Sequence, residues 1–448
     1  MKTFDLAVIG TGTATSAVDV CSREGWKVAV IDDRAYGGTC ALRGCNPKKV
    51  LVDAAGVVDL VRRTTGTLIE GEEPRIDWRQ LMEFKRSFTE PVAPGREQKY
   101  RESGVAQYHG RAHFVSPHAL QVGEEILEAK KILLANGASP MKLRIPGEEQ
   151  VTTSDEFLEL DALPEEIIFI GGGYISMEFA HVAARAGARV TILERGERIL
   201  KPFEAELVNR LVEHSRSIGI EFQLNHDVKR IDQEGEVLWV RCSHGDETVS
   251  YQAPLVVHGG GRVPNTEGLD LEKGEVEYDD RGVKVNEYLQ SISNPAVYAA
   301  GDISQHSAPP LSPVAMYEGD LVATNLLQGN IEKPDYRGIP SVCFTVPALA
   351  SVGLREREIE EAGIRYRKSE GDLSAFSSVR RVGESCAAYQ VYIDEENDLL
   401  LGAHLVGPEA SEVINLFAMA IRLNIRSTEL KSMMFAFPTS SFDIQYML

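Results

Sequence analysis

Two segments of the chain repeat one pattern: a short apolar strand, a glycine-rich turn, a helix, and a second apolar strand that ends on an acidic residue. The first copy occupies residues 5–32 and ends at Asp32, and the second occupies residues 167–194 and ends at Glu194. Glycines in such a turn let a pyrophosphate approach a helix N-terminus, and the terminal acid accepts ribose hydroxyls. The chain is therefore expected to be an α/β protein with two Rossmann-like dinucleotide-binding domains.

The two turns differ at their third glycine position. The first turn has Thr15 there, a β-branched residue that loosens the usual contact between helix and strand, whereas the second has Ser176, which is small enough for close packing. From these patterns we expect the dinucleotides to be bound by Gly10, Gly12, Thr15 and Asp32 in the first copy and by Gly171, Gly173, Tyr174, Ile175 and Glu194 in the second.

Two cysteines, Cys40 and Cys45, lie five residues apart just after the first pattern. Five residues of helix advance the chain by about 7.5 Å, more than the roughly 4.4–6.8 Å between the Cα atoms of a disulfide. The segment must therefore bend, and Gly44 is the natural bending point. Asn46 is expected to cap a helix whose first residue is Pro47, so that Cys45 lies at a helix N-terminus, where a thiolate is favoured. The pair predicts a redox-active disulfide; half of a zinc site and two inert thiols are the alternatives.

The overall charge and the cysteine usage exclude several kinds of partner. A net charge of −20 repels nucleic-acid phosphates and anionic membranes. No apolar segment approaches the length of a membrane span, and the start of the chain lacks a signal-peptide cleavage site. Six scattered cysteines are compatible with one catalytic pair in a reducing compartment. We expect a cytoplasmic protein without nucleic-acid or membrane partners.

The order of the three features along the chain suggests a path for electrons. Two dinucleotide units with a cysteine pair between them call for two cofactors in electronic contact with a disulfide, because hydride chemistry belongs to cofactors and the protein supplies their placement. This arrangement points to NAD(P)H, FAD and a dithiol in series.

With these two glycine turns and this cysteine pair, the chain resembles the pyridine nucleotide-disulfide oxidoreductases, the family of dihydrolipoamide dehydrogenase, glutathione reductase and mercuric reductase. The resemblance covers nearly the whole chain and includes further motifs at residues 261–265, 294–302 and 311–315. One segment departs from the family: residues 134–137 carry Asn136 where the family has threonine.

The resemblance implies a role for individual residues. Cys40 would be the interchange thiol that meets the substrate, and Cys45 the charge-transfer thiol against the flavin. Lys49 and Glu178 would form the ion pair beside flavin N5, and Asp302 would bind the ribityl chain. Lys49 is thus counted among both the catalytic and the cofactor-binding residues, and no metal-binding residue is expected. The other cofactor-binding residues implied are Gly38, Thr39, Ala135, Gly137, Gly261, Arg262, Gly301 and Ala315.

The resemblance also implies a domain order. The expected domains are a flavin domain formed by residues 1–146 and 266–334, a NAD(P) domain formed by residues 147–265, and a C-terminal α+β interface domain formed by residues 335–448. Within the last, residues 400–407 are expected to form a buried strand, and the apolar spacing of residues 410–423 predicts a helix in a dimer core. A homodimer is expected, with each active site completed by the partner's C-terminus.

The C-terminal segment departs from the thiol-directed members of the family, which end in a His-Pro-Thr motif with a glutamate five residues on. Phe437 holds the histidine position and Phe442 the glutamate position, so a general acid-base pair worth about 10²–10⁴ in rate is missing. Either the substrate needs no protonated leaving group, or another acid replaces the pair, for which Asp443, Tyr446 and His306 are candidates.

The leading functional hypothesis is an NADH-linked reductase of a small-molecule or protein-bound disulfide. Glu194 favours NADH, because a carboxylate repels the 2′-phosphate of NADPH, whereas Arg195 and Arg198 favour NADPH. A reductase of metal ions or quinones is the second hypothesis, and a redox sensor without turnover is the third.

Overall fold

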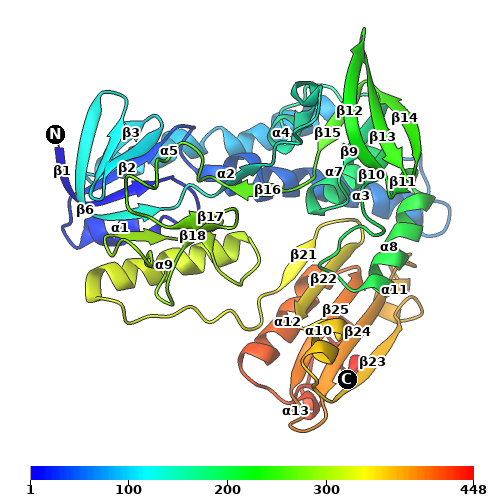
Figure 1. Cartoon of the computed structure of the whole chain (residues 1–448). Coiled ribbons are helices and arrows are strands. Elements are labelled where there is room, and N and C mark those ends of the chain that lie inside the picture. The colour runs from blue at the N-terminus through cyan, green and yellow to red at the C-terminus, as the bar shows by residue number, and fades with distance from the viewer. Residues whose placement is uncertain (1) are drawn as a thin grey trace. The chain divides into compact units, whose positions relative to one another are not determined.

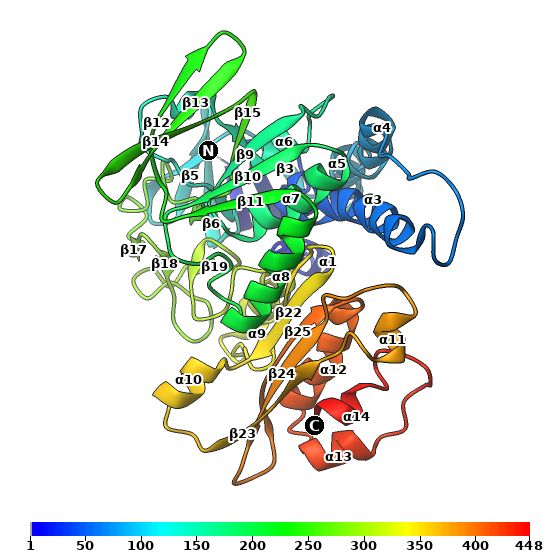
Figure 2. The same ribbon diagram turned by 90° about the vertical axis from the view of Figure 1, so that its right-hand side faces the viewer.

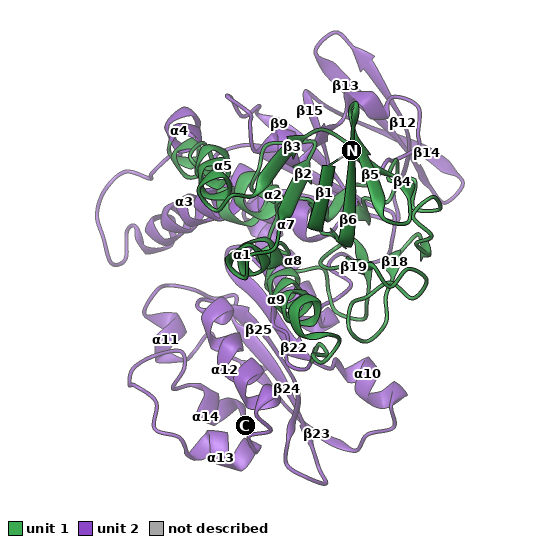
Figure 3. Cartoon of the chain, turned by 90° about the vertical axis from the view of Figure 1, so that its left-hand side faces the viewer, with its two compact units in different colours: residues 1–47, 84–141, 262–336 green, residues 48–83, 142–261, 337–448 purple. Residues whose placement is uncertain are grey.

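The computed structural model describes residues 2–448. The chain divides into two compact units, which Figure 3 shows in different colours. Unit 1 comprises residues 1–47, 84–141 and 262–336, and unit 2 comprises residues 48–83, 142–261 and 337–448. Each unit therefore collects three separate stretches of the chain.

A seven-stranded sheet forms the centre of unit 1 (Figure 1). Its strand order is β3-β2-β1-β6-β5-β4, and β19 pairs in parallel with β6. β1, β2, β3 and β6 run parallel, as strands joined by crossover connections do, whereas β4, β5 and β6 form an antiparallel meander. The strands are β1 Lys2–Ile9, β2 Val28–Asp32, β3 Ala106–His109, β4 Ala112–Ser116, β5 Ala119–Val122, β6 Glu125–Leu134 and β19 Val297–Ala299.

Side chains of β1 alternate between the two faces of this sheet, as the pleat requires. Leu6 and Val8 lie in a core cluster with side chains of three helices, and Ala7 and Ile9 lie in the cluster on the opposite face. Burial of both faces explains why the strand reads as a continuous apolar run. The three helices are α1 Ser16–Arg23, α5 Val92–Glu102 and α9 Ser312–Gln328. The remaining elements of unit 1 are α2 Gly38–Arg43, β7 Ala138–Pro140, β16 Arg262–Pro264, β17 Tyr278–Asp279, β18 Gly282–Lys284 and β20 Ser304–Gln305.

Unit 2 contains a second parallel sheet, of strand order β11-β10-β9-β15-β8. One core cluster joins β9 and β10 of this sheet to several helices, among them α3 Cys45–Thr64, α7 Tyr174–Arg185 and α8 Ala205–Ser217. The strands are β8 Thr152–Thr153, β9 Glu166–Ile170, β10 Arg189–Glu194, β11 Ile220–Leu224 and β15 Leu255–His258. Three strands that follow β11 and precede β15 in the sequence form a separate antiparallel sheet, green in Figure 2. They are β12 Asp227–Glu234, β13 Val237–His244 and β14 Glu247–Ala253. A short helix, α6 Ser154–Phe157, follows β8, and α4 Trp78–Thr89 crosses from unit 2 into unit 1.

The C-terminal part of unit 2 is an antiparallel sheet of order β21-β22-β25-β24-β23. Helix α12 Ala410–Arg422 lies along β22 and β25 (Figure 2), with Val413, Ile414 and Phe417 in the shared core. The strands are β21 Ser341–Cys343, β22 Ala348–Gly353, β23 Tyr366–Asp372, β24 Ala388–Asp394 and β25 Leu400–Gly407, and the short helices are α10 Glu356–Glu361, α11 Ser377–Arg380, α13 Ser427–Ser432 and α14 Ile444–Met447.

The structure confirms the elements that the sequence predicts around both glycine turns. The predicted buried strand 400–407 is β25, and the predicted helix 410–423 is α12. The place of α12 in a dimer core stays a prediction. Within residues 2–448, no helix combines the length and the apolar character that crossing a membrane requires.

Candidate functional site

The first glycine turn lies between β1 and α1, where backbone segments touch. Gly10 has φ +103°, and a Cβ there would lie 2.4 Å from the carbonyl oxygen of Ala135. Gly38 has φ +71°, and a Cβ there would lie 2.4 Å from the Cα of Gly12. These contacts require glycine, and they leave bare backbone at the start of α1, which is the environment that a pyrophosphate needs.

Side-chain hydrogen bonds hold the residues around this turn. Asp32 at the end of β2 accepts a hydrogen bond from the hydroxyl of Thr11 at 2.7 Å, and Thr15 donates to the carbonyl oxygen of Gly12 at 2.7 Å. The hydroxyl of Ser16, the first residue of α1, is buried without a hydrogen-bond partner. An unpartnered buried donor at a helix N-terminus suits an anionic ligand.

Three further motif segments meet in unit 1. Gly301 has φ +74° and is packed between Ala14 and Ala315, whose Cβ atoms lie 3.4 Å and 3.2 Å from the position of a Cβ on Gly301. Burial raises the pKa of the neighbouring Asp302, while the charge of Arg262 lowers it. The predicted residues Gly301, Asp302, Arg262 and Ala315 therefore share one environment next to the first glycine turn.

Asn136, which stands where the family has threonine, exchanges hydrogen bonds with Asn265. Its amide donates to the carbonyl oxygen of Asn265 at 2.8 Å, and the amide of Asn265 donates to the carbonyl oxygen of Asn136 at 2.6 Å. This reciprocal pair ties the turn at Gly137, where φ is +66°, to the end of β16. The unusual residue thus fixes the turn that the family motif forms.

Cys40 and Cys45 lie beside each other on two helices that meet at Gly44. Helix α2 ends at Arg43, Gly44 has φ −147°, and α3 begins at Cys45. Both cysteines are free thiols in this structure. A hydrogen bond with Cys45 and burial raise the pKa of Cys40, and the sulfur of Cys45 lies 3.3 Å from the hydroxyl oxygen of Ser312 on α9. The bend at Gly44 is as predicted.

The start of α3 differs from the prediction. Asn46 and Pro47 are the second and third helical residues, not the cap and the first residue. Proline fits there because the first turn of a helix donates no hydrogen bonds within the helix. Cys45 is therefore part of the helix and not a residue in front of it.

The ion pair with Glu178 is formed by Lys48, so the prediction of Lys49 is wrong. The Lys48 ammonium lies 2.9 Å from a carboxylate oxygen of Glu178, and both side chains are largely buried, whereas Lys49 pairs with Asp53. The other carboxylate oxygen of Glu178 accepts the backbone N–H of Phe344 at 2.8 Å, and the Phe344 ring lies 4.3 Å from the Lys48 ammonium.

The faces of helix α3 on which the two lysines lie explain why Lys48 forms the pair. Lys48 precedes the buried residues Leu51, Val52 and Ala55 by three, four and seven positions, so it lies on the buried face. Lys49 lies four positions before the exposed Asp53. Only the first lysine can reach α7.

The second glycine turn, between β9 and α7, is bound to Glu194 at the end of β10. One carboxylate oxygen of Glu194 accepts the backbone N–H of Gly172 at 2.7 Å, and the other accepts that of Gly196 at 2.8 Å. Gly171 has φ +94°, and a Cβ there would lie 2.7 Å from the Cα of Gly260. The acidic residue and the turn are therefore held in one fixed arrangement.

The start of α7 has the close packing that the sequence predicts. A Cβ on Gly259, the residue after β15, would lie 2.1 Å from the hydroxyl oxygen of Ser176, which is buried without a hydrogen-bond partner. Gly173 is the N-cap of α7 and Tyr174 its first residue. The Tyr174 ring packs on Phe203 at 5.4 Å between ring centroids, and burial raises the pKa of Tyr174 to about 12.

The C-terminal segment presents aromatic side chains. Phe437 is 71% exposed and forms an edge-to-face pair with Phe442 at 4.8 Å, and Tyr446 is 60% exposed. Asp443 is buried, accepts a hydrogen bond from Ser378, and has its pKa raised by burial. His306 lies in unit 1 with its Nε2 atom 3.1 Å from the carboxylate of Glu318.

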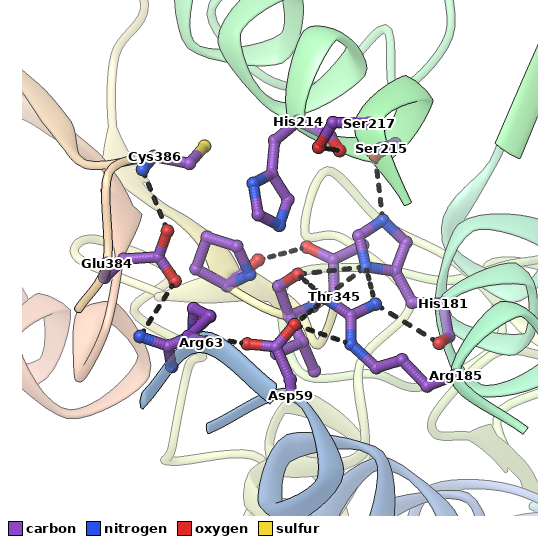
Figure 4. A network of polar contacts seen from close by, with 12 residues as sticks. Asp59, Arg63, His181, Arg185, His214, Ser215, Ser217, Thr345, Glu384 and Cys386 are labelled. Carbon is purple, nitrogen blue, oxygen red and sulfur yellow. Dashed lines mark hydrogen bonds and ion pairs between the residues drawn. The ribbon is translucent and has the colours of Figure 1, made fainter. Parts of the chain in front are cut away.

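A buried polar network in unit 2 joins α3 to α7 (Figure 4). Asp59 on α3 accepts two hydrogen bonds from the guanidinium of Arg185 on α7, at 3.0 Å and 2.7 Å, and a third from Arg63 at 2.7 Å. Arg185 is 2% exposed and Asp59 is 6% exposed. The two helices thus share a second ion pair, eleven residues after Lys48 on α3 and seven residues after Glu178 on α7.

The same network reaches three other segments of unit 2. Nδ1 of the fully buried His181 lies 3.1 Å from the backbone nitrogen of Val346, and its Nε2 lies 2.9 Å from the hydroxyl oxygen of Ser215 on α8. Glu384 lies 3.7 Å from Arg63 and accepts the backbone N–H of Cys386 at 2.8 Å. Burial holds the pKa of His181 well below its usual value, so His181 is neutral in this network.

Sequence reasoning missed Lys48, Ser312, Glu318 and the Asp59–Arg185 pair. A signal existed for Lys48, which shares its helical phase with the buried apolar residues of α3. Ser312 lies in the quoted motif at residues 311–315, which gave it no role of its own. No local pattern marks Glu318 or the Asp59–Arg185 pair, because their partners are distant in sequence. Among residues 2–448, no group of three or more His, Cys, Asp or Glu side chains is arranged to hold a metal ion.

Comparisons with known proteins place these features in a family. A family model described as pyridine nucleotide-disulphide oxidoreductase matches residues 4–319, and one described as the dimerisation domain of these enzymes matches residues 339–447. The glutathione reductase of Burkholderia cepacia is 32% identical over 441 residues, covering 97% of this chain and 96% of that protein. The mercuric reductase of Staphylococcus aureus is 32% identical over 435 residues, covering 95% of this chain and 78% of that protein.

A solved structure agrees with the fold over its whole length. The copper(II) complex of the HOCl-induced flavoprotein disulfide reductase RclA from Escherichia coli has a TM-score of 0.89 at 24% identity, and the match covers 100% of this chain and 99% of that one. The matches confirm the resemblance found in the sequence motifs and the α/β fold class with a C-terminal dimerisation domain.

Proposed function

Because the chain belongs to the pyridine nucleotide-disulphide oxidoreductase family, whose members use FAD and NAD(P)H, we propose that it reduces a disulfide with electrons from NADH. The electrons pass through FAD to the Cys40–Cys45 pair and from there to the substrate. One observation carries this proposal: Gly44 breaks the helix between the two cysteines and brings their thiols together. FAD, when bound, accepts a hydride from the nicotinamide and delivers two electrons to the disulfide.

The residues present fit two dinucleotides. We assign FAD to unit 1, at the turn of Gly10 and Gly12 with Asp32, and at the Gly301–Asp302 turn. We assign the pyridine nucleotide to the turn of residues 171–173. Both turns have bare, crowded glycine backbone, and each is followed by a buried serine hydroxyl without a partner, Ser16 or Ser176. The domain order is proposed as a flavin domain of residues 1–146 and 266–334, a NAD(P) domain of residues 147–265 and an interface domain of residues 335–448.

Lys48 is expected to matter for the transfer of electrons from NADH, and Lys49 is not. In this family a lysine-glutamate pair lies beside flavin N5, where a fixed cation stabilises developing negative charge. We expect Lys48→Met to slow anaerobic reduction by NADH by at least about tenfold. Lys49→Met, one residue away and paired with the exposed Asp53, is the matched control and should stay within about twofold of the unchanged protein. If stopped-flow traces showed that Lys49→Met slows reduction by NADH more than Lys48→Met does, the role would belong to Lys49.

NADH is expected to be preferred over NADPH. Two backbone N–H groups fix the carboxylate of Glu194 at the strand end, where it accepts ribose hydroxyls and repels a 2′-phosphate. The guanidinium of Arg198 already donates to the backbone carbonyls of Phe203 and Lys201. We expect kcat/KM for NADH to exceed that for NADPH by at least about tenfold, or about 1.4 kcal/mol. A preference for NADPH in steady-state assays would mean that the arginines dominate.

The substrate is proposed to be a disulfide whose departing thiolate is weakly basic. Phe437 and Phe442 supply no proton, and Asp443 is buried against Ser378. An alkyl thiolate with a pKa near 8.5 would then leave slowly. With NADH fixed, glutathione disulfide should turn over poorly, while an aromatic disulfide of low thiol pKa should be reduced readily. Turnover of glutathione disulfide at the higher rate would require a replacement acid, which substitution of Asp443, Tyr446 and His306 in turn would locate.

Reduction of quinones or metal ions is the second candidate function. It is favoured by the exposed ring of Phe437, packed on the half-buried ring of Phe442, because this aromatic surface suits a planar acceptor and provides no acid. If quinones are reduced quickly by variants without the cysteine pair, this function replaces the first.

A homodimer is proposed from the match to the dimerisation domain. Large apolar side chains are exposed near the C-terminus, among them Leu423 at 64%, Met434 at 100% and Phe437 at 71%. Soluble monomers rarely expose such a group of side chains, so a second copy of the chain is the expected partner.

A further inference from the structure

A buried carboxyl group lies in unit 1 outside the residues assigned to the reaction. Glu318 on α9 is 0% exposed. One carboxylate oxygen accepts the backbone N–H of Gly301 at 2.7 Å, and the other lies 3.1 Å from Nε2 of His306 and accepts the hydroxyl of Tyr336. The family motifs quoted from the sequence include Gly301 but give no role to the other three residues.

The hydrogen bonds determine where a proton can reside in this cluster. The backbone N–H of Ala308 donates to Nδ1 of His306 at 3.1 Å, so in the neutral ring Nε2 bears the hydrogen and donates to Glu318. Burial lowers the pKa of His306 and raises the pKa of Glu318 to about 7. A proton that enters the cluster near neutral pH therefore binds to Glu318, and His306 remains neutral.

The charged and titratable groups around Glu318 come from four segments. Asp302 lies in the turn before His306, and its negative charge raises the pKa of Glu318. Arg262 and His306 act on Asp302, and Tyr317 lies near Tyr336. Any new negative charge nearby raises the pKa of Glu318 further, because like charges disfavour the ionised carboxyl.

Helix α9 links this carboxyl to the redox cysteines. Ser312, the first residue of α9, contacts the sulfur of Cys45 at 3.3 Å. Glu318 follows six residues later, an advance of about 9 Å along the helix. Glu318 itself is 0% exposed, so a charge on Cys45, at the N-terminal end of the same helix, acts on a carboxyl that water does not solvate.

Reduction of the cysteine pair creates such a charge. NADH gives a hydride, the S–S bond breaks, and the products are NAD⁺, the Cys40 thiol and the Cys45 thiolate; atoms and electrons balance with no proton from solvent. We propose that Glu318 takes up one proton from water when this thiolate forms, so that its carboxylate is the proton store of the reduced site, held by His306 and Tyr336. This inference rests on the proposed function, because it requires NADH to reduce the cysteine pair.

The test compares Glu318→Gln with Asp320→Asn, which removes an exposed carboxyl from the same helix. The holoenzyme is brought to equilibrium with mixtures of NADH and NAD⁺ from about pH 6 to about pH 9, and new thiols are counted. Between the pKa of Glu318 in the oxidised site and its higher pKa in the reduced site, reduction takes up one extra proton. In this pH range the equilibrium constant for reduction by NADH changes by up to tenfold per pH unit. Glu318→Gln should lose this contribution, and Asp320→Asn should keep it.

Two other measurements keep the proposal falsifiable. Infrared difference spectra on reduction should show a new protonated-carboxyl band that Glu318→Gln lacks. If Glu318→Gln does not fold, Tyr336→Phe takes its place. This change removes a hydrogen-bond donor from the Glu318 carboxylate, so the pH range in which reduction takes up the extra proton should move upward. Equal pH slopes and equal infrared bands in all variants would overturn the proposal. If NADH produces no new thiols in the unchanged protein, the proposed function itself fails.

Discussion

Replacing Cys45 by serine is expected to reduce turnover of any disulfide substrate by at least about 10³-fold, the scale of removing a nucleophile or its covalent partner. A serine cannot form the S–S bond that stores two electrons, so the path from NADH to a disulfide is broken. Steady-state assays with an aromatic disulfide at saturating NADH measure the loss.

Two controls show whether the loss belongs to the cysteine pair. Cys242→Ser changes a buried cysteine in the sheet of β12 to β14 and should leave turnover unchanged. Cys40→Ser should abolish disulfide turnover as well, but it leaves Cys45 as a thiolate, and the resting protein should then show a long-wavelength thiolate-to-flavin absorbance. Disulfide turnover by Cys45→Ser at the unchanged rate would mean that another group carries the electrons.

Replacing Asp59 by asparagine is expected to destabilise the protein by about 3–5 kcal/mol, because it leaves the charge of Arg185 buried without its partner. Arg185 is 2% exposed and donates two hydrogen bonds to Asp59. The change in unfolding free energy is read from urea denaturation.

The matched control for this variant lies on the same helix. Asp53→Asn removes a carboxylate that is 65% exposed and paired with Lys49, and exposed pairs contribute about 0–1 kcal/mol. If the two variants lose the same stability, the Asp59–Arg185 pair does not hold α3 to α7.

The sequence predicts the parts of the fold that depend on local patterns. β1 and β9 are apolar runs, and the turns after them need glycine at Gly10 and Gly171 because φ is positive there. The bend at Gly44 follows from the geometry of a disulfide alone. Such features are encoded within a few neighbouring residues, so they are visible without the structure.

The residues that the sequence predicted wrongly or did not predict depend on which face of a helix is buried, or on partners that are distant in sequence. The choice of Lys49 over Lys48 came from matching a motif, whereas the buried face of α3 determines which lysine reaches Glu178. Asp59 and Arg185 lie 126 positions apart, and neither residue type by itself indicates burial. Glu318 looks like an ordinary helical glutamate until Gly301 and His306 are placed beside it.

A count of thiols tests the proposed redox pair most directly. The chain has six cysteines. After air oxidation, the denatured protein should react with a thiol reagent at four of them, and after anaerobic reduction by NADH at all six, with peptide mapping assigning the two new thiols to Cys40 and Cys45. An unchanged count, or new thiols at other cysteines, would contradict the account.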